Sequence, residues 1–398
     1  MKTMSTAELR GSIASRQAAM KFIVCLGLVS LFADATYEGA RSIVGPYLKD
    51  LGANTFQVGI IIGFGEMCAA SLRYFSGKLA DRTRAYWPLT ISGYLLNIVV
   101  VPGLAFTGNW KLAALLVIAE RAGKALRGPS RDVLLSEATS EVGHGWGFGI
   151  HGAMDQTGAV LGPLWVAWAV LRAHNRFQPA FLPLVIPATA AVITLLVAKS
   201  VHPGKGKPPK AAADQVLPKV FRLYVVAAGL LALGYIDFPF FAIHWVSHSL
   251  TTNSMIPVLY AAAMGGEGLA GLLIGRLYDR YGIGILSWCT LISLLSLPLG
   301  FLGGLRAALV AVACWAVGKG GQDACLRSGI ASVISMNKRG NAFGVFNAVW
   351  GVLWFAGSAA VGFLYLHSIV AVVVFGMVTQ LCGAVLFFIL RKSLAAAS

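Results

Sequence analysis

The sequence predicts an all-α membrane protein with twelve transmembrane helices, on the strength of three observations. Hydrophobic residues make up 57% of the 398 residues and charged residues only 12%, whereas soluble proteins average about 45–50% and about 25%. Apolar stretches of roughly 20 residues, the length that crosses a bilayer, recur along the whole chain. Motifs of the first half also return in the second half. The composition excludes a soluble enzyme.

Twelve apolar segments follow one another along the chain. They are 21–47, 56–79, 87–107, 111–133, 145–171, 179–198, 220–247, 254–277, 283–304, 307–332, 342–366 and 369–390. The longest polar interruption contains PGKGKPPK, a composition typical of flexible linkers. The predicted domains are a cytoplasmic N-terminal tail (1–20), an N-terminal six-helix bundle (21–199), a cytoplasmic linker (200–219), a C-terminal six-helix bundle (220–390) and a cytoplasmic C-terminal tail (391–398).

The two halves resemble each other in sequence. GKLADR at Gly77 returns as GRLYDR at Gly275, and Glu66 has a counterpart in Glu267. Asp34 in the first span corresponds to Asp237 in the seventh. Such matches in the same order indicate an internal repeat of six helices, which is how many secondary transporters are built.

The distribution of basic residues predicts the orientation. With both termini inside, the cytoplasmic segments hold about 21 of the 32 Lys and Arg residues, as the positive-inside rule requires. The outer loops hold only Lys49, Lys111, Arg172, Arg176 and Arg306. The net charge of +16 is therefore a cytoplasmic fringe that contacts anionic lipid, and nucleic acid is not needed to explain it. The six cysteines lie in apolar stretches without metal-ligand spacing.

Charged residues inside the predicted spans mark the functional region. Half of the sixteen acids fall at membrane depth, where a charge facing lipid costs at least about 2.5–3.5 kcal/mol. These acids must therefore face a shared polar cavity or pair with one another. The candidate proton-coupling or cavity residues are Asp34, Glu38, Arg41, Glu66, Glu120, Arg121, His151, Asp155, Asp237, His244 and Glu267.

Two pairs of these residues lie one helical turn apart. Asp34 and Glu38 share a helix face, and Arg41 can pair with Glu38. Asp34 has no basic residue one turn away, so burial favours its neutral, protonated form; it would then carry a proton or only hydrogen-bond a neighbouring helix. His151 and Asp155 could form a proton relay, supply two ligands for a divalent cation, or make a simple interhelical contact.

On these motifs the chain resembles the major facilitator superfamily. GKLADRTR and GRLYDRYG are similar to the loop motif G-x-L-x-D-R-x-G-R of that superfamily, although each copy departs from it after the Asp-Arg pair. The resemblance implies that Gly77, Asp81, Arg82, Gly275, Asp279 and Arg280 form a conformational latch. It also implies two bundles that rock about a central site, and it favours a monomer.

A glycine motif in the fifth span has two interpretations. Gly158, Gly162 and Pro163 resemble the core of the superfamily's antiporter motif, but Val166 and Ala167 replace its usual following glycine pair. Small residues four apart also let helices pack closely, and Pro163 can bend the helix.

The N-terminal half further resembles a bacterial group of uncharacterised or efflux-annotated members of the superfamily. The shared patterns are Asp-x-x-x-Glu from Asp34, R-x-G-K-x-x-R-x-P-x-R-D from Arg121, and H-x-A-M-D-x-x-G-A from His151. This likeness covers about the first 165 residues and indicates no substrate.

We therefore predict a secondary transporter of the bacterial inner membrane that exports a small molecule by exchange with protons. Asp34 and Asp155 are the first candidates for protonation. The alternatives are a divalent-metal exporter that uses Asp34, Glu38, His151 and Asp155, and uptake of an organic anion through Arg41, Arg121 and Lys124. A membrane-embedded enzyme or receptor is a further alternative without a clear nucleophile–base set. No Walker-type phosphate loop is present, so no nucleotide cofactor is expected.

Overall fold

The computed structural model describes residues 6–202, 218–334 and 339–395, which are helical with short connections and contain no strand. The elements of the first half are α1 (Thr6–Asp50), α2 (Thr55–Thr83), α3 (Tyr86–Gly103), η1 (Leu104–Phe106), α4 (Trp110–Val142), α5 (His144–Arg172), η2 (Gln178–Leu184) and α6 (Val185–Ser200). Those of the second half are α7 (Lys219–Gly234), α8 (Phe238–Ser247), α9 (Met255–Tyr281), α10 (Gly284–Leu294), α11 (Ser296–Leu302), α12 (Leu305–Val333), α13 (Arg339–Tyr365) and α14 (Ile369–Ala395). Most of the predicted linker, residues 203–217, lies outside the described residues.

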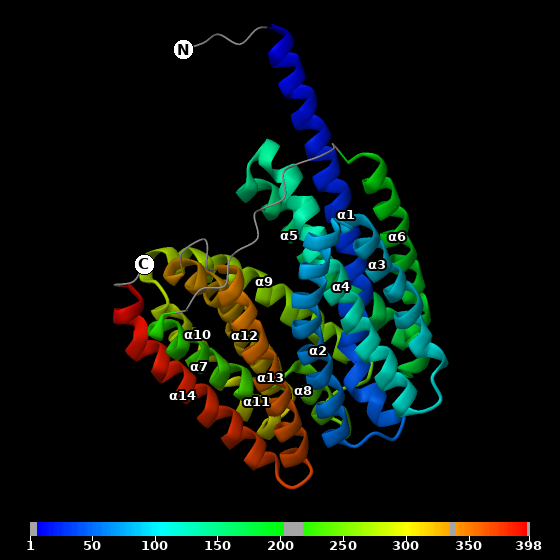
Figure 1. The fold of residues 1–398 in the computed structure, drawn as a ribbon. Coiled ribbons are helices and arrows are strands. Elements are labelled where there is room, and N and C mark those ends of the chain that lie inside the picture. Colours follow the sequence, from blue (N-terminus) through cyan, green and yellow to red (C-terminus); the bar gives the residue numbers. More distant parts are fainter. Residues whose placement is uncertain (1–5, 203–217, 335–338, 396–398) are drawn as a thin grey trace.

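These elements form two bundles that stand side by side (Figure 1). Each bundle contains six spans, because α7 continues into α8 and α10 into α11, and the predicted all-α fold is confirmed. Over the described part of the chain, nine helical stretches are apolar and long enough to cross a membrane by length and composition. The three spans left out are α4, α5 and α12, and α4 and α12 are rich in charge.

Local sequence signals explain several helix boundaries. Asn54 caps α2, and its side chain and that of Gln57 exchange hydrogen bonds with each other's backbone N–H groups, the reciprocal arrangement called a capping box. Asn109 caps α4 by accepting a hydrogen bond from the N–H of Leu112. Helix α1 has 45 residues, about 67 Å at 1.5 Å per residue, so it extends well beyond a bilayer core of about 30 Å.

The seventh span is broken where the sequence predicts continuity. Helix α7 ends at Gly234, and α8 starts after Asp237 with Pro239 in its first turn. Proline cannot donate the backbone hydrogen bond that a continuous helix needs, and it disfavours helical geometry in the residue before it. Asp237 caps the new helix through the N–H of Phe238, at 2.9 Å. The break moves this carboxyl to the boundary between the bundles.

Glycines allow the closest helix contacts within each bundle. A Cβ at Gly162 of α5 would lie 2.1 Å from the carbonyl oxygen of Ala35 in α1, and a Cβ at Gly357 of α13 would lie 2.1 Å from that of Leu233 in α7. These two pairs join equivalent spans of the two halves, since the first and fifth spans correspond to the seventh and eleventh. The internal repeat is therefore present in the packing as well as in the sequence.

Candidate functional site

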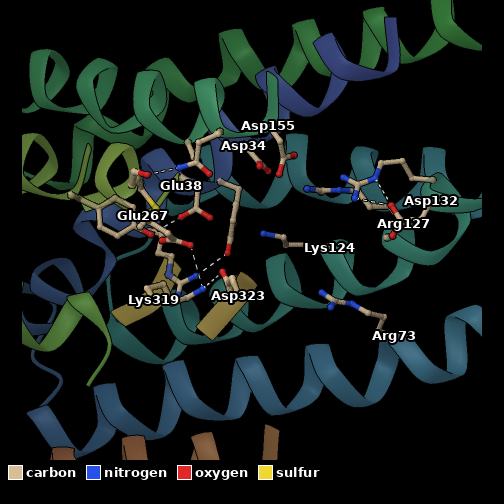
Figure 2. Close-up of a pocket in the computed structure, with 18 of the residues that line it drawn as sticks. Asp34, Glu38, Arg73, Lys124, Arg127, Asp132, Asp155, Glu267, Lys319 and Asp323 are labelled. Carbon is tan, nitrogen blue, oxygen red and sulfur yellow. Dashed lines mark hydrogen bonds and ion pairs between the residues drawn. The ribbon is translucent and has the colours of Figure 1, made fainter. Parts of the chain in front are cut away.

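A charged cavity of about 420 Å³ lies between the two bundles. Its walls come from α1, α2, α4 and α5 on one side and from α9 and α12 on the other. Figure 2 shows acids and bases from both bundles directed into this space. The charged lining residues are Asp34, Glu38, Arg41, Arg73, Lys124, Arg127, Arg131, Asp132, Asp155, Glu267, Lys319, Asp323 and Arg327.

The cavity opens toward the side on which α1 starts and α14 ends, called here the terminal side. At its deep end Tyr260 and Trp315 are buried, whereas the side chain of Asp132, near the terminal-side end of α4, is 55% exposed. On the opposite side the bundles are in contact. Asn253 donates a 2.8 Å hydrogen bond to the carbonyl of Asn175, and a Cβ at Gly45 would lie 2.7 Å from Pro239.

Arg41 joins the two bundles at the deep end of the cavity. Its Nη2 atom lies 2.7 Å from Oδ2 of Asp237 on α8 and 3.5 Å from Glu66 on α2, and its Nη1 donates to the hydroxyl of Tyr37. Arg121 also donates to Tyr37 and lies 3.4 Å from Glu66. The structure thus brings together Arg41, Glu66, Arg121 and Asp237, with Arg41 paired to Glu66 and Asp237 rather than to Glu38.

Glu38 and Glu267 take part in two further polar contacts in the cavity. Tyr260 of α9 donates a 2.5 Å hydrogen bond to Oε2 of Glu38, which is a second contact between the bundles. In the C-terminal bundle, Lys319 lies 3.3 Å from Glu267 and also pairs with Asp323. Lys319 is the repeat counterpart of Lys124, so each half directs one lysine into the cavity.

Asp34 and Asp155 approach each other across α1 and α5. Both carboxyl groups line the cavity and interact with each other, and Figure 2 shows them side by side. Lys124 extends into the cavity below them (Figure 2), with its Nζ atom 3.5 Å from the centre of the Tyr37 ring. Oδ1 of Asp155 is buried, and no N–H or O–H group of the described residues donates a hydrogen bond to it.

Six of the predicted residues are not part of the lining of this cavity. Glu66, Arg121 and Asp237 belong to the cluster around Arg41, and the other three make separate contacts. His151 forms a 2.9 Å hydrogen bond with Ser30 and no ion pair with Asp155. His244 contacts the hydroxyl of Tyr365 at 3.1 Å. Glu120 is buried beside Arg121 at 3.5 Å. These contacts are interhelical or local rather than directed into the cavity.

The metal-site hypothesis depends on a convergence of ligand atoms. Among the residues that the structure describes, no three His, Cys, Asp or Glu side chains are grouped so that they could hold one metal ion. Glu38 is engaged by Tyr260 and His151 by Ser30. Asp34 and Asp155 alone would leave most of the coordination positions of a divalent ion without a protein ligand.

The predicted latch residues lie on the terminal-side ends of α2 and α9. Asp81, Arg82, Asp279 and Arg280 are exposed, and over the described ranges none of them forms an ion pair. Pro163 lies within α5 after Gly162, and Gly158 packs against Leu31 as Gly162 packs against Ala35.

Several cavity residues were absent from the predicted set. Arg73, Arg127 and Arg327 line the cavity, and Tyr37 and Tyr260 supply hydroxyl groups to Arg41 and Glu38. The arginines are charges inside apolar spans, the same signal that selected the acids, so a search for both signs of charge would have found them. The tyrosines carry no such signal.

A twelve-span, two-bundle fold around a charged, one-sided cavity defines a secondary membrane transporter, not an enzyme. The model of the Major Facilitator Superfamily matches residues 26–358, and this chain belongs to that superfamily. An uncharacterized protein of Mycobacterium tuberculosis is 39% identical over 390 residues, covering 96% of this chain and 95% of the relative. An uncharacterized MFS-type transporter of Methanocaldococcus jannaschii is 25% identical over 392 residues, covering 93% of this chain and 95% of the relative.

Solved structures with the same fold include two kinds of transporter. The nucleoside transporter NupG matches with a TM-score of 0.68 at 14% identity, over 94% of this chain and 98% of the other. A POT family transporter in complex with a thioalcohol-conjugated peptide matches with a TM-score of 0.73 at 12% identity, over 94% and 96%. At these identities the likeness concerns the fold alone.

Proposed function

We propose that this protein exports a small molecule across the bacterial inner membrane in exchange for protons. It acts by alternating access, as a monomer, with both termini in the cytoplasm and anionic lipid around its basic cytoplasmic fringe. Asp34 and Asp155 together form the proton site. The small molecule and the proton use the same cavity between the bundles, in opposite directions.

The contact between Asp34 and Asp155 is the observation that carries this proposal. An ionised carboxylate only accepts hydrogen bonds, so two neighbouring carboxyl groups can bond to each other only while one of them holds a proton. Two such carboxyls in one site do not both ionise readily, because the second charge is repelled by the first. The pair is therefore a place where a proton can be held at membrane depth.

Lys124 gives the pair a way to release that proton. Its ammonium group faces Asp34, and their charges attract each other. When the proton leaves, this attraction stabilises the negative charge that remains on the pair. A proton can thus leave the pair on the side where the cavity is open.

The side on which the cavity opens supports the proposed direction of transport. The terminal side is the side that the positive-inside rule assigns to the cytoplasm. A cavity open on that side, as here, is ready to take a molecule from the cytoplasm and to release a proton there. Export against a proton gradient requires both events in the same conformation.

The proton site is tested by Asp34→Asn and Asp155→Asn in proteoliposomes. A panel of organic cations, anions and neutral compounds is screened for movement with and without a pH gradient. We expect each variant to lose at least about tenfold of gradient-driven transport, since an amide cannot give up a proton at neutral pH. Exchange of labelled for unlabelled compound without a gradient should continue, because it requires no proton release.

Asp132→Asn is the matched control for these variants. Asp132 is also an acid of the cavity lining, but it is exposed and pairs with Arg131 on its own helix. This variant should keep most of the gradient-driven transport. Near-normal coupled transport by Asp34→Asn would remove the carboxyl pair as the proton site, and metal flux that ignores the gradient would favour a metal exporter instead.

The latch hypothesis makes a prediction about the conformational balance. Among the described residues Asp279 has no ion-pair partner, so we assign its role as a latch to the opposite conformation, in which a carboxylate at a helix terminus contributes about 0.3–1 kcal/mol. Asp279→Asn should therefore favour the present conformation several-fold. In a cysteine-free background, a cysteine at Ala159 in the cavity lining should then be alkylated faster from the cytoplasmic side. Unchanged labelling relative to Asp50→Asn, an exposed acid on the opposite side, would contradict the latch.

A further inference from the structure

A second, smaller cavity of about 260 Å³ adjoins the central one and extends toward α13. The two cavities share six lining residues, five of them basic. These are Arg41, Arg73, Lys124, Lys319, Asp323 and Arg327. The entrance from the central cavity into this side cavity is therefore positively charged.

Arg73 and Arg327 place positive charge at this entrance without an ion pair of their own among the described residues. The two acids that line the side cavity, Glu66 and Asp323, are paired with other bases. Arg73 comes from α2 and Arg327 from α12, so they belong to opposite bundles. Within the described ranges no carboxylate lies within 4 Å of either, and the two guanidinium groups repel each other. Asp323, the acid that both cavities share, is paired with Lys319. Two like charges held together in a partly dehydrated space are stabilised by an anion that binds both.

The far wall of the side cavity is aromatic. Trp350 and Trp354 of α13 line it with ring centroids 5.9 Å apart, and Phe346 stacks on Trp350 at 5.7 Å. Planar rings gain dispersion and quadrupole interactions against such a surface, beyond the burial of their area.

Two side chains that line the side cavity carry buried polar atoms without a hydrogen-bond partner among the described residues. The side chain of Gln322 is 1% exposed and lines the cavity, and neither its Oε1 nor its Nε2 atom has a partner in the structure. Nε1 of Trp354 is likewise buried and unpartnered. A buried polar group without a hydrogen bond destabilises the protein, so a ligand that pairs with the amide would recover that loss.

We propose that the side cavity binds a planar organic anion of one or two rings. Its acidic group lies between Arg73 and Arg327, its ring stacks on Trp350 and Trp354, and a polar ring substituent pairs with the Gln322 amide. This assignment rests on the proposed function as a small-molecule transporter and gives the substrate its chemical class. Of the residues that the sequence suggested for anion uptake, Arg41 and Arg121 are already paired with carboxylates. Arg73 and Arg327 bind the anion in their place.

The probe for this site is 2-naphthoate, and its binding to the full chain in nanodiscs is measured by calorimetry at fixed salt without a pH gradient. The neutral amide 2-naphthamide and the non-planar cyclohexanecarboxylate serve as matched compounds. We expect wild-type protein to bind 2-naphthoate about tenfold more tightly than either, a difference of about 1.4 kcal/mol, because 2-naphthamide lacks the charge that pairs with the arginines and cyclohexanecarboxylate lacks the aromatic ring.

Variants separate the three parts of the site. Arg73→Gln and Arg327→Gln should each weaken 2-naphthoate about tenfold and leave 2-naphthamide unchanged. Trp350→Leu should remove the preference for 2-naphthoate over cyclohexanecarboxylate. Gln322→Leu should remove any extra affinity of 6-hydroxy-2-naphthoate over 2-naphthoate. Arg222→Gln, at an exposed position outside both cavities, should behave as wild type.

The outcomes distinguish this site from the proton mechanism. If wild type does not prefer 2-naphthoate, or if both arginine variants bind it as Arg222→Gln does, the site is wrong. Binding is measured at equilibrium, so Asp34→Asn should retain it even though coupled transport is lost. A protein that binds 2-naphthoate at this site but moves nothing in response to a pH gradient would overturn the proton mechanism and leave the anion site intact.

Discussion

Replacing Gly162 by alanine is expected to separate α1 from α5 and to abolish transport. The added Cβ would lie 2.1 Å from the carbonyl oxygen of Ala35 and 2.6 Å from its Cα. These are backbone atoms, so no side-chain rotation can relieve the clash, and the helices themselves must move apart. Overpacking of this kind costs about 1–3 kcal/mol and sometimes more. Gly158→Ala should behave alike, because its Cβ would lie 2.1 Å from the carbonyl of Leu31.

The functional loss should exceed the loss of stability. Asp34 lies between Leu31 and Ala35 on α1, and Asp155 lies one turn before Gly158 on α5. Any separation of the two helices therefore draws the carboxyl pair apart, and a shared proton requires a heavy-atom distance of about 3 Å or less. The glycines that resemble the antiporter motif thus set the geometry of the proposed proton site.

Gly152→Ala on the same helix is the matched control. Its Cβ would meet no atom within 4 Å, and alanine is the better helix former by about 1 kcal/mol. Thermal unfolding followed by size-exclusion fluorescence should place this variant at or above wild type and both Gly158→Ala and Gly162→Ala several degrees below. Equal melting temperatures for Gly162→Ala and Gly152→Ala would refute the close contact between α1 and α5.

The fold could be predicted because the bilayer restricts the secondary structure that a membrane-spanning segment can adopt. A stretch of about 20 apolar residues has to be a helix there, since no water is present to satisfy the backbone. The sequence repeat from Gly77 to Gly275 then implied two similar bundles. A polar cavity could be predicted because charged side chains such as Asp34 and Asp155 are too costly in free energy to face lipid.

The partners of these charges could not be predicted, because they depend on the packing of distant spans. Arg41 is three residues from Glu38, yet it pairs with Asp237, which lies 196 positions away. Glu38 instead accepts a hydrogen bond from Tyr260, 222 positions away. Local spacing on one helix limits which pairs can form, but contacts between helices decide which pairs do form.

The break before α8 could have been predicted from residues already in view. Asp237, Phe238 and Pro239 place a strong N-cap residue two positions before a proline in the first helical turn, which is a common start signal of a helix. Hydropathy alone conceals it, because the surrounding residues are as apolar as those of an unbroken span.

Neutralising Asp237 is expected to weaken the closed side of the transporter. Asp237→Asn keeps the helix cap, because asparagine caps as well as aspartate, but it removes the charge that Arg41 meets at 2.7 Å. Asp237 is 2% exposed, and loss of its charge leaves Arg41 with only the longer contact to Glu66, at 3.5 Å; a hydrogen bond between charged groups contributes about 1.5–3 kcal/mol. The ion pair can form only when the bundles are closed on the side opposite the termini, as they are here. Its loss therefore destabilises the present conformation and not the opposite one. The balance should move toward the opposite conformation by roughly one to two orders of magnitude if about 1.5–3 kcal/mol is lost.

Spin labels at Arg176 and Thr252, exposed positions in loops of the two bundles on that side, measure this balance by electron–electron distance in a cysteine-free background. Asp237→Asn should enlarge the population with a long distance between labels, whereas Asp132→Asn, which removes an exposed pair worth about 0–1 kcal/mol, should not. The double variant Arg41→Gln/Asp237→Asn should lie nearer to wild type than either single variant, because no buried charge is then left without a partner. If the double variant instead shows the sum of the two single effects, Arg41 and Asp237 act independently and the ion pair does not close the transporter.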